Sequence, residues 1–134
     1  MSGLVLKLAP NERLLINGAV IENGNRRGRL NILTPGAHIL RLRDAIHPEN
    51  SNTPVKRLCY QAQLVLSGDA TMETVGPKLI EGIDELSAVF RDAESHAVLS
   101  AARRACTEGK AYYALKFLRQ LIETEEFLLS VATR

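Results

Sequence analysis

The sequence predicts an α+β protein. A small antiparallel β-sheet or barrel-like meander of about five strands should precede an antiparallel bundle of about four helices. Two observations lead to this class. Short apolar segments alternate with turn-forming residues over the first fifty positions, which is typical of strands. From position 53 onward, apolar residues instead recur at the spacing of amphipathic helices.

Length and composition are consistent with a folded chain of this kind. The 134 residues are 46% hydrophobic and 24% charged, which is enough apolar material for a core. Tryptophan is absent, so the core must be built mainly from Leu, Ile, Val and Ala. We divide the chain into a basic β part, 1–50, and a helical part, 51–134, which we expect to pack as one compact unit.

Turn residues delimit the first three strands. Gly3–Leu8 is the first, and the next two are Glu12–Ile16 and Ala19–Glu22. Asn17-Gly18 lies between the second and third strands. This dipeptide accepts the two positive φ angles of a type I′ turn and predicts a tight hairpin.

Two further strands are expected before the helices begin. Leu30–Leu33 forms the fourth, and Thr34-Pro35-Gly36 turns the chain into the fifth, His38–Leu42. Because side chains alternate along a strand, Arg41 and Arg43 should lie on one face.

The first helix has clear start and stop signals. Thr53 is a good N-cap, Pro54 suits the first helical position, and Gly68 ends the pattern. A second helix should run from about Thr74 to Phe90.

A third helix should begin after Asp92 or Ser95 and continue through Cys106. The fourth is expected from Lys110 to about Thr124. Glu125–Ala132 either continues the fourth helix or forms a short terminal one.

Several classes of function find no support in the sequence. Cys59 and Cys106 stand alone in helical patterns, which favours buried thiols over a disulfide or a metal site. Nucleophile and phosphate-loop motifs are absent. We therefore expect no enzymatic activity, no metal and no cofactor. Without a signal peptide or a long apolar run, we expect a cytoplasmic protein that does not enter the membrane.

Positive charge is concentrated in the β part. Residues 1–50 contain seven basic and four acidic residues, a net charge of +3, whereas the remainder has ten and eleven, a net charge of −1. Such asymmetry suggests a surface for a polyanion, and RNA is the candidate. The candidate RNA-binding residues are the seven basic ones: Lys7, Arg13, Arg26, Arg27, Arg29, Arg41 and Arg43.

These cations also have a simpler interpretation. Charge on an edge strand blocks aggregation, and the Arg26–Arg29 turn could be a solvated hairpin tip. No Phe, Trp or Tyr precedes Tyr60, so RNA would have to be held by guanidinium planes, backbone groups and shape.

Apolar residues near the C-terminus form a second candidate surface. Tyr112, Tyr113 and Phe117 span more than one face of the fourth helix, and Leu128 and Leu129 follow. They could be core and rim. Alternatively, they could receive an amphipathic helix of a protein partner.

Three segments carry a family resemblance: MSGLVLKLAPNERLLINGAVIENG, TPGAHILRLRDAIHPENSNTPVKRLCYQAQLVLSGD and YYALKFLRQLI. They resemble the FlbT family, which regulates flagellin synthesis in alphaproteobacterial flagellar systems. The resemblance implies a small cytoplasmic, non-enzymatic protein. It would act on the 5′ untranslated region of flagellin messenger RNA, limiting translation and lifetime, alongside flagellin and a FlaF-type regulator.

The β part also resembles the carbon-storage regulator CsrA. Leu-Val-Leu-Lys, Asn-Glu-Arg-Leu-Leu-Ile-Asn-Gly, Thr-Pro and Arg-Asp-Ala-Ile occur in the CsrA order. This resemblance implies that Lys7 and Arg43 lie near the two basic positions that meet single-stranded GGA. The turn lengths differ, the CsrA double arginine is missing, and a helical half replaces a single short helix.

Two functional hypotheses follow. In the first, the β part binds the flagellin messenger and represses it. In the second, the helical part is an adaptor or chaperone for flagellin or FlaF, and effects on RNA are indirect. An exposed first or last strand could also pair across a two-fold axis and give a homo-oligomer.

Overall fold

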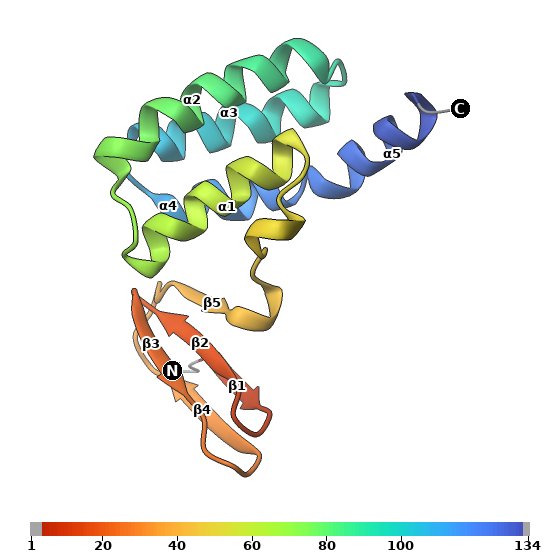
Figure 1. Ribbon diagram of the computed structural model, residues 1–134. Coiled ribbons are helices and arrows are strands. Elements are labelled where there is room, and N and C mark those ends of the chain that lie inside the picture. Colours follow the sequence, from red (N-terminus) through yellow and green to blue (C-terminus); the bar gives the residue numbers. More distant parts are fainter. Residues whose placement is uncertain (1–3, 133–134) are drawn as a thin grey trace. The chain divides into compact units, whose positions relative to one another are not determined.

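The structure is a computed structural model that describes residues 4–132 (Figure 1). Within this range the chain forms five β-strands and then five α-helices, with two short 3₁₀-helices between them. The predicted α+β class is therefore confirmed. The chain divides into two compact units, Met1–Ala45 and Ile46–Arg134, here called the β unit and the helical unit.

The β unit contains two antiparallel sheets. One pairs β1 (Leu4–Leu8) with β4 (Gly28–Ile32). In the other, β2 (Arg13–Ile16) lies between β3 (Ala19–Glu22) and β5 (Ile39–Arg41). Only β2 and β3 pair as sequence neighbours, so most of the ladders join strands that are distant in the chain.

The hairpin between β2 and β3 has the predicted turn. Asn17 has a φ angle of 48° and Gly18 one of 85°, as a type I′ turn requires. The Asn17 amide donates to the His38 carbonyl oxygen at 2.9 Å, and the His38 amide donates to Asn17 Oδ1 at 2.9 Å. The hairpin is thereby fastened to the chain that enters β5.

A small apolar core holds the β unit together. Leu6, Leu8 and Leu14 are buried in it, and five half-buried side chains pack against them: Ile16, Ile21, Leu30, Ile32 and Ile39. Because side chains alternate along β1, Lys7 is exposed between its two buried neighbours.

The fifth strand is shorter than predicted, and this changes the position of Arg43. Strand β5 ends at Arg41, and the 3₁₀-helix η1 (Leu42–Asp44) follows it. The prediction that Arg41 and Arg43 share a strand face is therefore wrong. The physical reason is the register: Arg41 is opposite Leu14, and β2 begins only one residue earlier, at Arg13. A longer β5 would have almost no partner strand.

The helical unit is a succession of five helices in the described chain (Figure 1). They are α1 (Pro54–Ser67), α2 (Met72–Val89), α3 (Ala93–Thr107), α4 (Ala111–Arg119) and α5 (Ile122–Ala132). Helix α1 contacts α2 and α4, and α3 packs against both α2 and α4.

Side-chain caps set the starts of three helices. Thr53 Oγ1 accepts from the Lys56 amide at 3.3 Å, which confirms the predicted start of α1. Thr71 caps α2, which starts before the expected Thr74. Asp92 Oδ2 accepts from the Ser95 amide at 2.9 Å and caps α3.

Both cysteines are free and buried in the helical unit, as predicted. Burial raises the pKa of Cys59 to about 12 and that of Cys106 to about 11. The thiols therefore stay protonated at neutral pH and act as small core residues.

The helix expected from Lys110 to Thr124 is two helices, α4 and α5. Helix α4 ends at Arg119, and the Leu121 amide donates to the Leu118 carbonyl oxygen at 3.0 Å in the turn that follows. In α5, the side chain of Glu125 is buried, and its Oε2 accepts from the Val55 amide at 2.8 Å. Helix α5 thus supplies a second cap to the N-terminus of α1.

We predict that Glu125→Ala lowers the free energy of unfolding by about 1–3 kcal/mol, because it leaves the buried Val55 amide without an acceptor. The matched control is Glu123→Ala, an exposed glutamate on the same helix. It should change stability by no more than about 0.5 kcal/mol. Chemical denaturation of the whole chain measures both, and equal effects would show that the Glu125 cap contributes nothing.

Candidate nucleic-acid interface

Strands β1 and β4 place two cations side by side. Lys7 is directly opposite Arg29 in the ladder, and both side chains are exposed. Neither forms an ion pair with any carboxylate whose side chain the structure describes. Like charges directly opposite one another destabilise a sheet. An anion bound between Lys7 and Arg29 would remove that repulsion.

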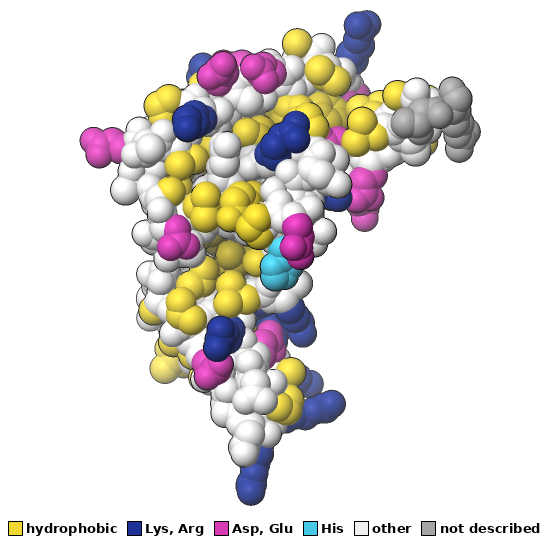
Figure 2. Space-filling view, in the orientation of Figure 1, with side chains coloured by type: hydrophobic (Ala, Val, Ile, Leu, Met, Phe, Trp, Pro, Cys, Tyr) yellow, Lys and Arg dark blue, Asp and Glu magenta, His cyan; other side chains and the backbone are white. Residues whose placement is uncertain are grey.

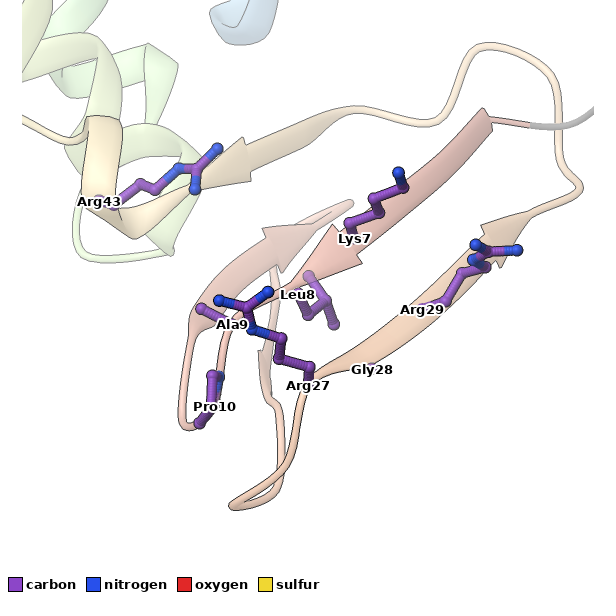
Figure 3. A pocket seen from close by; sticks show the side chains of 8 residues that line it. All are labelled: Lys7, Leu8, Ala9, Pro10, Arg27, Gly28, Arg29 and Arg43. Atoms are coloured by element: carbon purple, nitrogen blue, oxygen red, sulfur yellow. The ribbon is translucent and has the colours of Figure 1, made fainter.

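The Lys7–Arg29 pair borders a hollow in the β unit (Figure 3). Its volume is about 560 Å³. Four cationic side chains and a short turn line this hollow, which we call the basic hollow. Its lining residues are Lys7, Leu8, Ala9, Pro10, Arg27, Gly28, Arg29 and Arg43. Four cations around one hollow suit a ligand with several negative charges.

Arg43 reaches the basic hollow from η1. Its side chain is 60% exposed, and its Nε is 3.9 Å from Glu12 Oε2. At this distance the ion pair is weak, and an exposed guanidinium keeps most of its donors for a ligand.

Arg41 has a different environment from Arg43. Its Nε donates to Glu12 Oε2 at 2.7 Å and its Nη2 to Glu12 Oε1 at 2.8 Å. Nη2 also donates to the Lys7 carbonyl oxygen at 2.5 Å. The side chain is only 18% exposed and does not line the basic hollow. Arg41 thus forms internal contacts, although its sequence context resembles that of Arg43.

Glu12 is held in its charged form by these contacts. Its side chain is 6% exposed, and hydrogen bonds from Arg41, and then from the Ala9 amide, lower its pKa from 4.5 to about 2. Glu12 was not among the residues predicted from the sequence. Its neighbours signal only a turn, and the residue that binds it is twenty-nine positions away.

The two remaining candidates lie outside the hollow. Arg13 forms an exposed cross-strand ion pair with Glu22, with Nε 2.8 Å from Oε1. Arg26 is exposed in the turn before β4, where its carbonyl oxygen accepts from Asn23 Nδ2 at 2.9 Å. Of the seven predicted cations, Lys7, Arg27, Arg29 and Arg43 are brought together.

The uncharged wall of the hollow was not predicted either; it is formed by Leu8, Ala9, Pro10 and Gly28. A signal was present in the Ala9-Pro10-Asn11 turn, where Asn11 adopts a positive φ of 60°. The turn is held in place because Asn23 Nδ2 donates to the Ala9 carbonyl oxygen at 2.7 Å.

The predicted partner-binding residues lie in two places of the helical unit. Tyr113 and Phe117 of α4 line a groove of about 270 Å³ together with residues of α3 and the α3–α4 turn. Tyr112 is beside this groove, and its ring packs edge-to-face on Tyr113 at 5.4 Å. Leu128 and Leu129 are exposed on α5 instead.

Exposed apolar side chains on α5 form a larger set than the sequence analysis selected. Phe127 is 65% exposed and Val131 is also exposed, so they join Leu128 and Leu129. Hydrophobic side chains are visible along this helix and around the groove between α1 and α2 (Figure 2).

Residues 4–132 contain no cluster of three or more His, Cys, Asp or Glu side chains that could hold a metal ion. No helix in that range is long and apolar enough to cross a membrane.

Comparison with known proteins gives the family. The family model described as "Flagellar protein FlbT" matches residues 4–129. The chain belongs to the FlbT family. This confirms the resemblance found in the sequence and includes both units in the match.

Curated relatives agree with this assignment. The "Probable flagellum biosynthesis repressor protein FlbT" of Chelativorans sp. strain BNC1 is 33% identical over 93% of this chain and 85% of the relative. The protein of that name from Caulobacter sp. strain K31 is 30% identical over 92% of this chain and 93% of its own. The "Flagellum biosynthesis repressor protein FlbT" of Caulobacter vibrioides strain CB 15 is 29% identical over 92% and 86%. No solved structure matches the chain significantly.

The lowered pKa of Glu12 predicts acid sensitivity. In the folded chain Glu12 binds fewer protons than in the unfolded chain, so its contribution to stability is complete above pH 4.5 and is lost as the pH falls toward 2. We expect the melting temperature to fall over this range, and to fall less in Glu12→Gln. Hydrogen bonds from Ser95 lower the pKa of Asp92, which makes the same acid-sensitive contribution to stability in both proteins. If the melting temperatures of wild type and Glu12→Gln depended on pH in the same way, Glu12 would not be the source of this acid sensitivity.

Proposed function

We propose that this FlbT-family protein is a post-transcriptional regulator of flagellin synthesis. It binds the 5′ untranslated region of flagellin messenger RNA in the basic hollow, represses translation and promotes decay of the message. The names of its relatives, flagellum biosynthesis repressors, support the biological setting. The observation that carries the mechanism is the basic hollow, with Lys7 opposite Arg29 and with Arg27 and Arg43 beside them.

The composition of the hollow favours RNA phosphates as the first contact. Its cations are carried by strands, a tight turn and η1, so a ligand would meet charges already held near one another. Phosphate neutralisation by such cations supplies most of the affinity of nucleic-acid binding and makes it dependent on salt. The protein acts by binding, and no catalytic step is part of the proposal.

Base contacts would depend on few groups. The β unit contains no Phe, Trp or Tyr on which bases could stack, because Tyr60 is the first such residue in the chain. Guanidinium planes of Arg27 and Arg29 can stack on unpaired bases, and the exposed Ala9 and Pro10 offer apolar contact. Single-stranded leader RNA fits this arrangement better than a duplex.

We predict that Arg29→Ala and Arg27→Ala weaken binding of a flagellin leader RNA and flatten its salt dependence. The log–log slope should fall by about 0.7 for each RNA phosphate that the variant no longer neutralises. Arg13→Ala is the matched control, because it removes the same charge from an exposed site of the same unit outside the hollow. Fluorescence anisotropy at several salt concentrations measures all three. An equal decrease in affinity for Arg13→Ala and Arg29→Ala would mean that only net charge matters.

A second candidate function is supported by the helical unit. The groove lined by Tyr113 and Phe117 suits an amphipathic helix of flagellin or of a FlaF-type regulator, and the exposed apolar side chains of α5 offer further contact area. In this adaptor function, the partner rather than the RNA would be the direct ligand. The two functions use different units and can coexist.

For the adaptor function we predict that Tyr113→Ala combined with Phe117→Ala lowers capture of purified flagellin or FlaF at least about fivefold, because buried aromatic anchors dominate such interfaces. Binding of leader RNA should not change. Val89→Ala, an exposed apolar residue of α2 outside this groove, is the control. Unchanged capture by the folded double variant would exclude the groove as the partner site.

A further inference from the structure

Glu12 lies at a point where several donors converge. Its two carboxylate oxygens accept from Arg41 Nη2 and Nε, and Oε1 also accepts from the Ala9 amide at 2.9 Å. Arg43 Nε is 3.9 Å from Oε2. An acidic side chain is thus held within reach of a hollow lined by four cations.

We propose that Glu12 is a positioning residue for RNA: through Arg41 and Ala9 it fixes the spacing of the cations and the wall of the basic hollow. The inference rests on the proposed function of that hollow. In this role Glu12 does not contact RNA, and its negative charge favours binding instead of opposing it.

The contacts of Arg41 carry the first part of this inference. No strand ladder joins the two sheets within the described β unit. Arg41 is the last residue of β5, and its Nη2 donates to the carbonyl oxygen of Lys7 on β1. Glu12 orients that guanidinium through two further hydrogen bonds. The pair thereby connects the strand that carries Lys7 to the segment that carries Arg43.

The Ala9–Glu12 turn carries the second part. The Ala9 amide donates to Glu12 Oε1, and the Glu12 amide donates to the Ala9 carbonyl oxygen at 3.2 Å. Ala9 and Pro10 line the basic hollow. Glu12 therefore fixes both a wall of the hollow and, through Arg41, two of its cations.

Glutamine cannot replace Glu12 in this network. A carboxylate presents two acceptor oxygens, whereas an amide presents one acceptor and one donor. Both Oε1 and Oε2 of Glu12 face N–H donors, so either orientation of a glutamine amide would set an NH₂ group against one of them. Glu12→Gln should release Arg41 or Ala9 while barely changing side-chain size.

The expected effect is opposite to that of simple electrostatics. Removing a carboxylate beside a polyanion site normally raises affinity, because repulsion is removed. Glu12→Gln should instead weaken leader-RNA binding about fivefold or more, since misplaced donors no longer form charge-assisted hydrogen bonds. Glu22→Gln is the matched control: it removes the exposed carboxylate partner of Arg13, outside the hollow, and should bind as tightly as wild type or tighter.

The experiment is fluorescence anisotropy of the full chain with leader RNA over a range of salt concentrations. If Glu12 only stabilised the fold, Glu12→Gln would lower the fraction of protein able to bind RNA. The slope of the logarithm of the binding constant against the logarithm of the salt concentration would stay unchanged. Displacement of Lys7 or Arg43 should flatten the slope by about 0.7 per cation. Wild-type or tighter affinity for Glu12→Gln would overturn the proposal.

Two further measurements cover the remaining outcomes. If Glu12→Gln does not fold, Arg41→Lys tests the same network with net charge preserved, and an unchanged affinity and slope would overturn the proposal. If the wild type does not bind leader RNA, the proposed function fails, and hydrogen exchange of the Ala9 amide then tests the positioning alone. Faster exchange in Glu12→Gln than in Glu22→Gln would support it, and equal rates would contradict it.

Discussion

The β unit depends on a charge-assisted contact between Glu12 and Arg41. The apolar cluster around Leu6, Leu8 and Leu14 is small, and the strands of the unit form two separate sheets. So small a core gives limited stability by itself. The Arg41 guanidinium adds a bidentate pair with Glu12 and a hydrogen bond to the Lys7 carbonyl oxygen. This one side chain therefore connects β5 both to β1 and to the residue that precedes β2.

This use of Arg41 changes how the positive charge of the β unit is interpreted. A cation paired bidentately inside a unit contributes to structure, and an exposed cation such as Arg13 has a carboxylate partner across the strands. The cations of the basic hollow are left to act on a ligand. Net charge alone would count all seven alike, whereas the structure separates those that face the hollow from those that do not.

The sequence predicted the features that local chemistry determines. Asn17-Gly18 specifies its hairpin, Thr53-Pro54 starts α1, and Gly68 ends it in a left-handed conformation, because each signal acts within a few residues. The α+β class follows from such signals together with the change of hydrophobic period. The basic character of the β unit was equally evident from composition.

Features that depend on distant residues could not be predicted in this way. The pairing of β1 with β4 brings Lys7 to Arg29 across more than twenty positions of sequence, and no local pattern encodes it. The end of β5 at Arg41 depends on where β2 begins, which is why Arg43 was placed on the wrong element. Likewise, no glycine or proline marks the break between α4 and α5, and the burial of Glu125 against α1 is a tertiary contact.

The central claim is that the β unit contacts RNA directly through the basic hollow. Photo-crosslinking of the full chain to a flagellin leader RNA, followed by mass-spectrometric mapping of the modified peptides, tests it most directly. We expect crosslinks in the segments that contain Lys7–Pro10 and Arg27–Arg29, and their disappearance at high salt. Crosslinks confined to the helical unit, or none at moderate salt, would contradict the claim and leave the adaptor function as the better explanation.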